Sequence, residues 1–211
     1  MTQSAPSETP QHHAICTAAR ELFSRYGYRR VSLEDIANEA GMSRSGIYNY
    51  FRNKEEILKT VVGEIGSVSH RRAEAAASSN APLVTRLRDI FDAKLVEIYA
   101  ELHGTPHGEA LTDQNLKVTD KLMETWAVHF ISLVAKVLKK ADKNGEINLA
   151  QVDLTPNRAA QYLVMCARGL KTSGRAPLRP EEYRNRIRTL IDVSVLGFGG
   201  ANISPSETKK R

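Results

Sequence analysis

Residues 32–41 carry the start and stop signals of one short helix, and they constrain the fold more than any other stretch of the chain. Ser32 and Asp35 have the spacing of a capping box, in which the serine oxygen accepts from the first turn and the acidic side chain reaches back to the cap. Gly41 can take the left-handed backbone that ends a helix, because it has no Cβ. Apolar residues recur between these signals at helical intervals, so one face is predicted to pack on other helices: Leu33, Ile36, Ala37 and Ala40.

A second short helix is predicted directly after this turn. Ser43 is its expected N-cap, and Ile47 and Phe51, four residues apart, point together toward the first helix. The opposite side carries Arg44, Ser45, Tyr48 and Asn49. Arginine pairs with guanine and asparagine with adenine, whereas tyrosine and serine reach phosphates. The pattern therefore indicates a helix-turn-helix whose second helix reads DNA.

A third helix is predicted to open at Lys54, since Asn53 and Glu56 repeat the capping spacing. The N-terminus of a helix attracts phosphate, and the charge of Lys54 adds to that attraction. We therefore expect a phosphate contact from Lys54.

The sequence SLEDIANEAGMSRSGIYNYFRNKEEIL resembles the helix-turn-helix of TetR-family transcriptional regulators. It has the Gly-x-Ser turn, the Tyr-x-Tyr-Phe end of the recognition helix and the Asn-Lys-Glu-Glu opening of the next helix, and the likeness extends back to about residue 11. The resemblance implies a homodimeric regulator, expected to be a repressor, that a small-molecule effector releases from a palindromic operator in double-stranded DNA. The expected DNA-binding residues are Ser43, Arg44, Ser45, Gly46, Tyr48, Asn49, Tyr50 and Lys54.

The net charge of +6 does not by itself point to the N-terminal region as the DNA-binding part. Residues 1–60 hold 8 Lys and Arg against 7 Asp and Glu, whereas residues 151–211 hold 11 against 5. Only the side that meets DNA has to be basic, however. Several arginines flank the proposed recognition helix and can supply that charge: Arg25, Arg29, Arg30 and Arg52.

Apolar residues at helical spacing continue along most of the chain, which predicts an all-α protein of about nine helices. The predicted helices cover residues 11–26, 54–72, 83–103, 112–143, 156–173 and 181–196, besides the two short ones. The N-terminal three-helix unit at 11–55 is the expected DNA-binding domain, and 56–197 is the expected ligand-binding and dimerisation domain. Residues 1–10 are predicted to be a disordered tail, and residues 198–211 a flexible one.

The last two helices are the predicted dimerisation pair, because their apolar stripes are wide enough to cover their own core and a second subunit. The alternative is that they only close the core of a monomer. The predicted interface residues are Leu163, Ala167, Leu170, Ile187, Leu190 and Ile191.

Aromatic residues on inward stripes of several helices predict a mostly apolar effector pocket in the larger domain. A closed core would use the same residues, so the pocket follows mainly from the resemblance, and the effector is expected to be largely apolar. The predicted lining residues are Phe91, Tyr99, Trp126, Phe130 and Tyr162.

Other classes of function have little support in the sequence. There is no phosphate-binding glycine loop, nucleophile elbow or zincin motif, so an enzyme is not expected and neither is a cofactor. His103 and His107 have a metal-ligand spacing, but Gly104 and Pro106 break the helix between them and no metal site is expected there. A DNA-binding protein without an effector remains the alternative function.

The location of the protein is predicted from what the sequence lacks. No apolar run approaches the length of a membrane span, and the N-terminal residues lack the pattern of a signal peptide, so a cytoplasmic protein is expected. Cys16 and Cys166 fall on helical faces and are predicted to be buried free thiols, with a redox sensor as the alternative.

Overall fold

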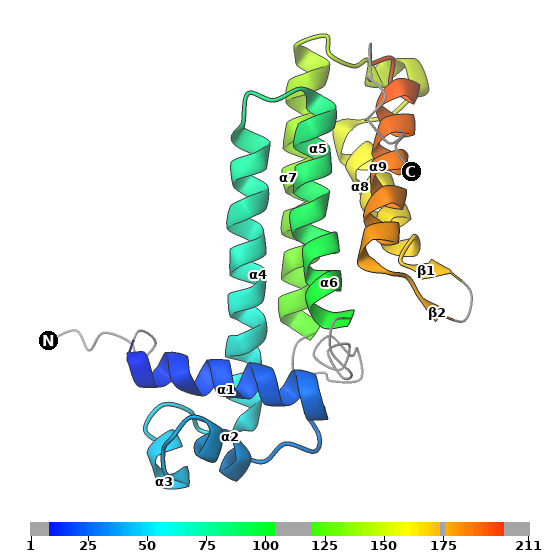
Figure 1. Ribbon diagram of the computed structural model, residues 1–211. Helices are drawn as coiled ribbons and strands as arrows, with labels where there is room; N and C mark the ends of the chain where they lie inside the picture. The colour runs from blue at the N-terminus through cyan, green and yellow to red at the C-terminus, as the bar shows by residue number, and fades with distance from the viewer. Residues whose placement is uncertain (1–8, 104–119, 174–175, 201–211) are drawn as a thin grey trace, which may run out of the picture. The chain divides into compact units, whose positions relative to one another are not determined.

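The computed structural model describes residues 9–103, 120–173 and 176–200, and these residues form nine α-helices with short π- and 3₁₀-helical turns (Figure 1). The predicted all-α class is confirmed, with one two-stranded antiparallel pair as the only sheet in the described ranges. The elements are α1 Pro10–Tyr26, α2 Leu33–Glu39, α3 Arg44–Ile47, α4 Lys54–Ser78, α5 Leu83–Phe91, the π-helix η2 Asp92–Val96, α6 Glu97–His103, α7 Asp120–Lys143, the 3₁₀-helix η4 Leu149–Val152, α8 Pro156–Gly169, β1 Thr172–Ser173, β2 Ala176–Pro177 and α9 Pro180–Gly197.

The chain divides into two compact units. The first unit is residues 1–68 with 98–125, and the second is residues 69–97 with 126–211. The helix α4 contributes residues to both units, so the division does not follow the ends of the helices. The predicted DNA-binding domain at 11–55 lies wholly within the first unit, and the boundary at residue 55 stays a prediction.

The first unit has its core where α1 packs on α2 and α2 on α3. The Thr9 side chain caps α1 by accepting from the backbone of His12, and Gly27 ends the helix with a φ of 83°. The buried side chains follow the apolar positions predicted from spacing, because each short helix has only one face available for packing. Ile15, Phe23, Ile36, Ile47 and Leu58 are all fully buried.

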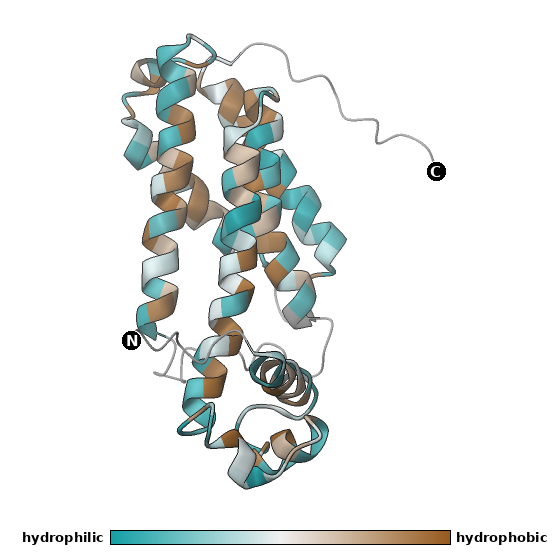
Figure 2. Ribbon diagram, turned by 90° about the vertical axis from the view of Figure 1, so that its left-hand side faces the viewer, coloured by the Kyte–Doolittle hydropathy of each residue, from teal (hydrophilic) through white to brown (hydrophobic). Residues whose placement is uncertain are grey.

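The second unit is built around α5, α8 and α9, with α9 packed against both of the others. Each long helix carries hydrophobic and hydrophilic residues along its length (Figure 2), as expected of amphipathic helices that share a core. The buried hydroxyl of Tyr183 on α9 donates to the backbone carbonyl of Ala167 on α8 over 3.1 Å. This bond links the two helices through a buried polar group, as buried hydroxyls require.

Several predicted boundaries differ from the structure. The helix α1 begins at Pro10, inside the predicted N-terminal tail, because Thr9 supplies the cap. Phe198 is 8% exposed and its carbonyl accepts from the backbone of Asn148, so the predicted flexible C-terminal tail does not begin there. The helix α8 ends at Gly169, and residues 172 and 173 pair with 177 and 176 instead of continuing it. Residues 104–119, which include His107, lie outside the described residues.

The two cysteines have different environments. Cys16 is buried as predicted, and burial raises the pKa of its thiol to about 12, with the charge of Glu64 acting in the same direction. Cys166 is exposed on α8, so the prediction of a buried thiol is wrong there. Each described helix is too short or too polar to cross a membrane.

Candidate nucleic-acid interface

The capping box predicted for the first helix of the helix-turn-helix is present in full. The backbone amide of Ser32 donates to the Asp35 carboxylate over 2.8 Å, and the amide of Asp35 donates to the Ser32 hydroxyl over 3.1 Å. The pKa of Asp35 is lowered below its ordinary value, first by the backbone donor of Ser32 and then by its hydroxyl. The start of α2 is therefore fixed by two side chains three residues apart, without a tertiary contact.

The turn between α2 and α3 is tight because Gly41 has a φ of 67°, a conformation that side chains with a Cβ rarely adopt. Ser43 then caps α3, its hydroxyl accepting from the backbone amide of Gly46 over 3.1 Å. A Cβ at Gly46 would lie 3.3 Å from that hydroxyl, closer than most real contacts. The absence of a Cβ at Gly46 therefore leaves room for the Ser43 hydroxyl beside the amide that it caps.

The two sides of α3 separate as predicted. Ile47 is fully buried and Phe51 is 3% exposed, so both pack into the first unit. The polar side is open to solvent at Arg44, Ser45, Tyr48 and Asn49, while Gly46 and Tyr50 are half-buried. The helix itself is only four residues long and continues as turns through residue 50. The outward side chains have the donors needed for base edges and phosphates, so their contact with DNA stays the prediction.

In the absence of DNA, Arg44 lies near an acid. One guanidinium nitrogen is 3.9 Å from a carboxylate oxygen of Glu34, and both side chains are more than half exposed. An ion pair of this kind contributes about 0–1 kcal/mol to stability. Arg44 is therefore free to leave Glu34 for a stronger acceptor.

Lys54 does not have the environment predicted for it. Its ammonium group donates to the backbone carbonyls of Tyr28 and Val31 over 2.7 and 2.6 Å, and it lies 4.5 Å from the centroid of the Tyr28 ring. Partial burial lowers the pKa of Lys54. The charge is directed at the chain between α1 and α2, which gives Lys54 a structural role, and its contact with phosphate stays a prediction. The predicted cap at this helix is present, with the Asn53 side chain accepting from the amide of Glu56 over 2.9 Å.

Residues 15–61 match the sequence profile described as bacterial regulatory proteins of the tetR family. This range holds most of α1, both helices of the helix-turn-helix and the first turns of α4. The chain belongs to the TetR family.

Three individual proteins show how far this TetR-family likeness extends. An uncharacterized HTH-type regulator of Bacillus subtilis, YfiR, is 31% identical over 104 residues, which are 42% of this chain and 50% of that protein. The fatty acid metabolism regulator protein of the same organism is 26% identical over 144 residues, or 65% and 71% of the two chains. The structure of SmeT, the repressor of a multidrug efflux pump in Stenotrophomonas maltophilia, is 18% identical with a TM-score of 0.70 and covers 97% of this chain and 98% of its own.

YfiR is named a transcriptional regulator, and the other two are named a regulator protein and a repressor. The chain spans half of the length of YfiR. The likeness to SmeT shows the fold alone. The protein is accordingly a DNA-binding transcriptional regulator of the TetR family, and the expectation that it is not an enzyme is confirmed by the names of its relatives.

The five aromatic residues predicted to line an effector pocket in this TetR-family chain do not share one environment. Phe91 and Phe130 lie in the core of the second unit, with ring centroids 5.1 Å apart and packed edge to face. Trp126 is half-buried in the same unit, whereas Tyr99 is buried in the first unit. Tyr162 is 46% exposed on α8, so its placement on an inward stripe is wrong. A pocket that uses all five residues is therefore not supported.

A groove of about 570 Å³ lies elsewhere on the second unit of the regulator, along α7 and the start of α8. Its lining is mainly apolar and includes Val128, Ile131, Ala135 and Pro156, and none of the five predicted aromatic residues. The sequence did not identify this groove, because helical spacing marks buried stripes and not the concavities between outward faces.

The sequence also missed a buried cation at the π-helix η2. Lys94 is 7% exposed, and its ammonium nitrogen lies 6.0 Å from the centroid of the Phe130 ring. Burial lowers the pKa of Lys94, and the charge of Arg168 acts in the same direction. Lys94 has no acidic partner within the ranges that the structure describes. A π-helical turn is rare and often occurs at functional sites, so Lys94 is a better marker of a ligand site than any of the predicted aromatics.

Most of the residues predicted for the dimer interface of the regulator lie inside the single chain. Leu163, Ala167, Ile187 and Ile191 are at most 3% exposed, so we correct them to core positions. Leu170 and Leu190 are half-buried. A side chain already enclosed by its own chain has no surface left for a partner. The exposed apolar residues of these helices are Tyr162, Met165, Val193 and Leu196, which we call the α8/α9 outer face.

Proposed function

We propose that the protein is a homodimeric repressor that reads a palindromic operator with two copies of α3 and leaves it when a small-molecule effector binds. One observation supports this most directly. The capped helix α3 buries Ile47 inward and exposes Arg44, Ser45, Tyr48 and Asn49 outward. A single helix of this length contacts few base pairs, so discrimination requires two of them on successive half-sites.

The α8/α9 outer face is the surface we assign to the dimer. Met165, Val193 and Leu196 are each more than half exposed, and Tyr162 nearly so. Within each helix the exposed pair is three residues apart, so both members lie on one side of that helix. A group of large exposed apolar side chains on two helices that pack together is typical of an interaction surface.

The effector site is proposed beside Lys94 in the second unit. The rings of Phe91 and Phe130 offer an apolar wall, and Lys94 and Arg168 both bring positive charge. Burying a cation without a counterion is costly, so an anionic group would be stabilised at this position. The ligand class that fits is a largely apolar molecule with one acidic group.

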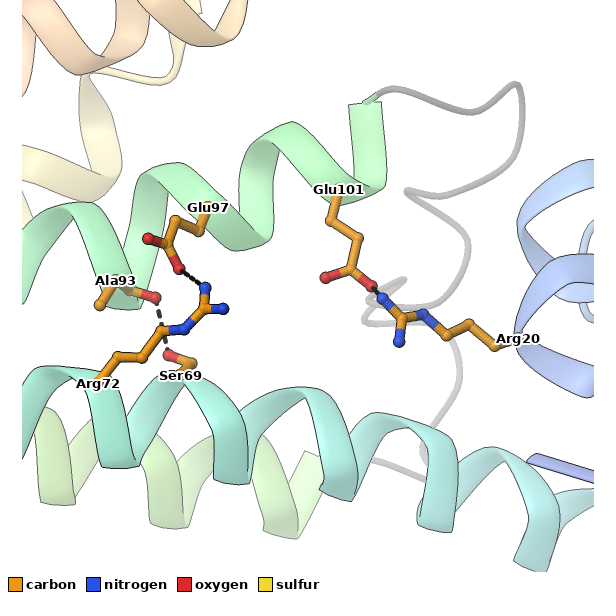
Figure 3. Close-up of polar contacts among 6 residues, drawn as sticks. All are labelled: Arg20, Ser69, Arg72, Ala93, Glu97 and Glu101. Atoms are coloured by element: carbon orange, nitrogen blue, oxygen red, sulfur yellow. Dashed lines mark hydrogen bonds and ion pairs between the residues drawn. The ribbon is translucent and has the colours of Figure 1, made fainter. Parts of the chain in front are cut away.

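The helices α4 and α6 are the segments through which we propose that the effector acts, and Figure 3 shows polar contacts that they make. In the second unit, the Ser69 hydroxyl of α4 donates to the carbonyl of Ala93 over 2.9 Å, and Arg72 pairs with Glu97 at 2.5 Å. Ala93 adjoins Lys94 within η2, and Glu97 follows as the first residue of α6, so a shift of η2 would be transmitted to α4. Because α4 also supplies residues to the first unit, its movement would change the spacing of the two recognition helices and remove simultaneous half-site contact.

The last turn of α6 is held in the first unit by an ion pair. Arg20 of α1 pairs with Glu101 of α6 (Figure 3). Since η2 and α6 are consecutive in the chain, this pair joins the neighbourhood of Lys94 to the helix that packs on α2.

The decisive experiment is selection of bound duplexes from a random DNA pool by the full-length protein, followed by footprinting. The expected result is an enriched palindrome with half-sites about 34–36 Å or slightly more apart, protected on both halves. A library of apolar carboxylic acids is then added, and release from the selected duplex is followed by fluorescence anisotropy. Enrichment of a single unpaired half-site would contradict the dimer. The effector site would be contradicted if none of the acids released the wild-type protein from the selected duplex and if the Lys94→Met variant gave the same anisotropy response as wild type.

A further inference from the structure

Three side chains with metal-binding atoms meet between α1 and α4 in the first unit. His12 and Cys16 are one helical turn apart on α1, and Glu64 comes from α4. Their ligand atoms all lie within 4.8 Å of one another. His12 and Cys16 are buried at 6% and 2% exposure, while Glu64 is exposed. The cluster thus has a buried side made by α1 and an open side made by α4.

The geometry of the two α1 residues is close to that of a chelate. His12 Nδ1 and Cys16 Sγ are 3.9 Å apart. Zinc bound at its usual distances to nitrogen and sulfur in a tetrahedron places these two atoms about 3.5 Å apart. The His12 ring is held in this orientation by Phe51, whose ring centroid is 4.7 Å away. Small side-chain rotations, without backbone movement, therefore bring the nitrogen and sulfur into position.

A hollow of about 310 Å³ opens beside this cluster. Cys16 and Glu64 both line it, together with His13, Thr17, Arg20 and Glu21. An ion can reach the sulfur and the carboxylate from this side, and a water molecule, which occupies about 30 Å³, has room to complete the coordination. The site then has three protein ligands and one exchangeable position.

We propose that His12, Cys16 and Glu64 bind one divalent transition metal ion of the zinc class. Nitrogen, thiolate and carboxylate donors together suit Zn²⁺ and its neighbours, and disfavour Mg²⁺ and Ca²⁺, which take oxygen ligands. On binding, the Cys16 sulfur exchanges its proton for the metal and the proton is released to solvent. One thiolate and one carboxylate then balance the two charges of the ion, so no net charge is left at the buried side.

Binding joins α1 to α4, the two helices that flank the helix-turn-helix in the sequence. A ligand that binds only the folded state raises the thermal midpoint in proportion to the logarithm of its concentration. Metal binding should therefore stabilise the first unit, and this inference does not depend on operator binding or on the effector site.

The test is a titration of the full-length, chelator-treated protein with Co²⁺ without oxygen, followed by absorption spectroscopy. The expected result is one equivalent of Co²⁺ with a sulfur-to-cobalt charge-transfer band and the strong visible bands of tetrahedral cobalt. Zn²⁺ should displace Co²⁺, since it lies higher in the affinity order, and should raise the melting temperature.

The chain offers matched controls for each ligand. Cys16→Ser should lose the charge-transfer band, while Cys166→Ser, which alters the exposed thiol, should keep it. His12→Gln should weaken binding, while His129→Gln at an exposed histidine of α7 should not. Glu64→Gln changes an exposed side chain and should fold normally, yet lower Zn²⁺ affinity by more than about tenfold.

Each other outcome overturns the assignment. A protein that shows no charge-transfer band and no change in melting temperature with Zn²⁺ has no metal site at this cluster. A band that survives Cys16→Ser and disappears in Cys166→Ser places the metal elsewhere. If Cys16→Ser fails to fold, Glu64→Gln decides, and unchanged Zn²⁺ affinity in that variant excludes the three-residue site.

Discussion

The ammonium group of Lys54 donates a hydrogen bond to the backbone carbonyl of Val31 over 2.6 Å. A second donation, to the carbonyl of Tyr28, fixes both ends of the segment that leads from α1 into α2. The first residue of α4 therefore holds the loop that positions the start of the helix-turn-helix. Backbone carbonyls outside regular structure need such partners, because they have none within a helix.

Replacing Lys54 by methionine should destabilise the protein by about 1–3 kcal/mol, since two carbonyls lose a charged donor. The free energy of unfolding in urea measures this. Lys59→Met is the matched control on the same helix, because Lys59 pairs with Glu55 one turn away and is about half exposed. Its effect should stay within about 0.5 kcal/mol. Equal losses in the two variants would contradict the structural role of Lys54.

The salt dependence of operator binding separates that structural role from the phosphate contact expected from sequence. A lost phosphate contact reduces the slope of log K against log salt by about 1. Because Lys54 is directed at Val31 and Tyr28, Lys54→Met should leave the slope unchanged at temperatures where the variant is folded. A flatter slope for Lys54→Met would show that Lys54 contacts phosphate.

The capping box should make stability fall in acid. The Ser32 amide and hydroxyl hold the pKa of Asp35 below the 3.8 of an ordinary carboxyl group. A lowered pKa in the folded state stabilises the fold above the unfolded pKa, and this stability is lost as the pH falls through the folded pKa. Asp35→Asn retains an acceptor for the cap but does not titrate. Urea unfolding from about pH 5 to about pH 3 should show wild type losing stability relative to Asp35→Asn, with Glu39→Gln as the control in the same helix. Parallel curves for wild type and Asp35→Asn would count against the role of this carboxylate.

Arg44→Ala should weaken binding to the selected operator by about 1–3 kcal/mol and relax preference at one base position. Its stability should change by less than about 0.5 kcal/mol, because the ion pair with Glu34 is 3.9 Å long and exposed. Glu34→Gln frees the same guanidinium and should leave operator affinity unchanged or higher. Anisotropy titrations on single-base operator variants measure these effects. A uniform loss on every variant would mean that Arg44 contacts phosphate and reads no base.

A glutamate introduced on α8 should give a folded monomer at an exposed position and an unfolded chain at a buried position nearby. Met165 is 66% exposed, so Met165→Glu should give a folded monomer if the α8/α9 outer face is the dimer contact. Leu163 is 3% exposed, so Leu163→Glu buries an unpaired charge and should unfold the chain. Sedimentation velocity and circular dichroism distinguish the outcomes. A dimeric Met165→Glu protein would place the interface on another surface.

The local structure of the helix-turn-helix could be predicted from sequence, because its determinants lie within a few residues of one another. Ser32 and Asp35 close a capping box, Gly41 takes the left-handed turn, and Ser43 caps α3, all as their spacing predicts. The buried side of α3 followed from the four-residue interval between Ile47 and Phe51. Interactions between close neighbours depend little on the rest of the fold, so the residue types alone determine them.

Only the tertiary structure decided which apolar and charged residues face inward. Periodicity marks an apolar stripe, but it does not tell whether the chain's own helices or a partner covers that stripe, and Leu163 and Tyr162 were therefore assigned to the wrong surroundings. Lys54 and Lys94 both direct their ammonium groups inward. The groups that these ammonium groups face lie 23 to 36 positions away in the sequence. The meeting of Cys16 with Glu64 likewise depends on how α1 packs on α4, because contacts between distant residues are set by the packing of whole helices and leave no pattern in the local sequence.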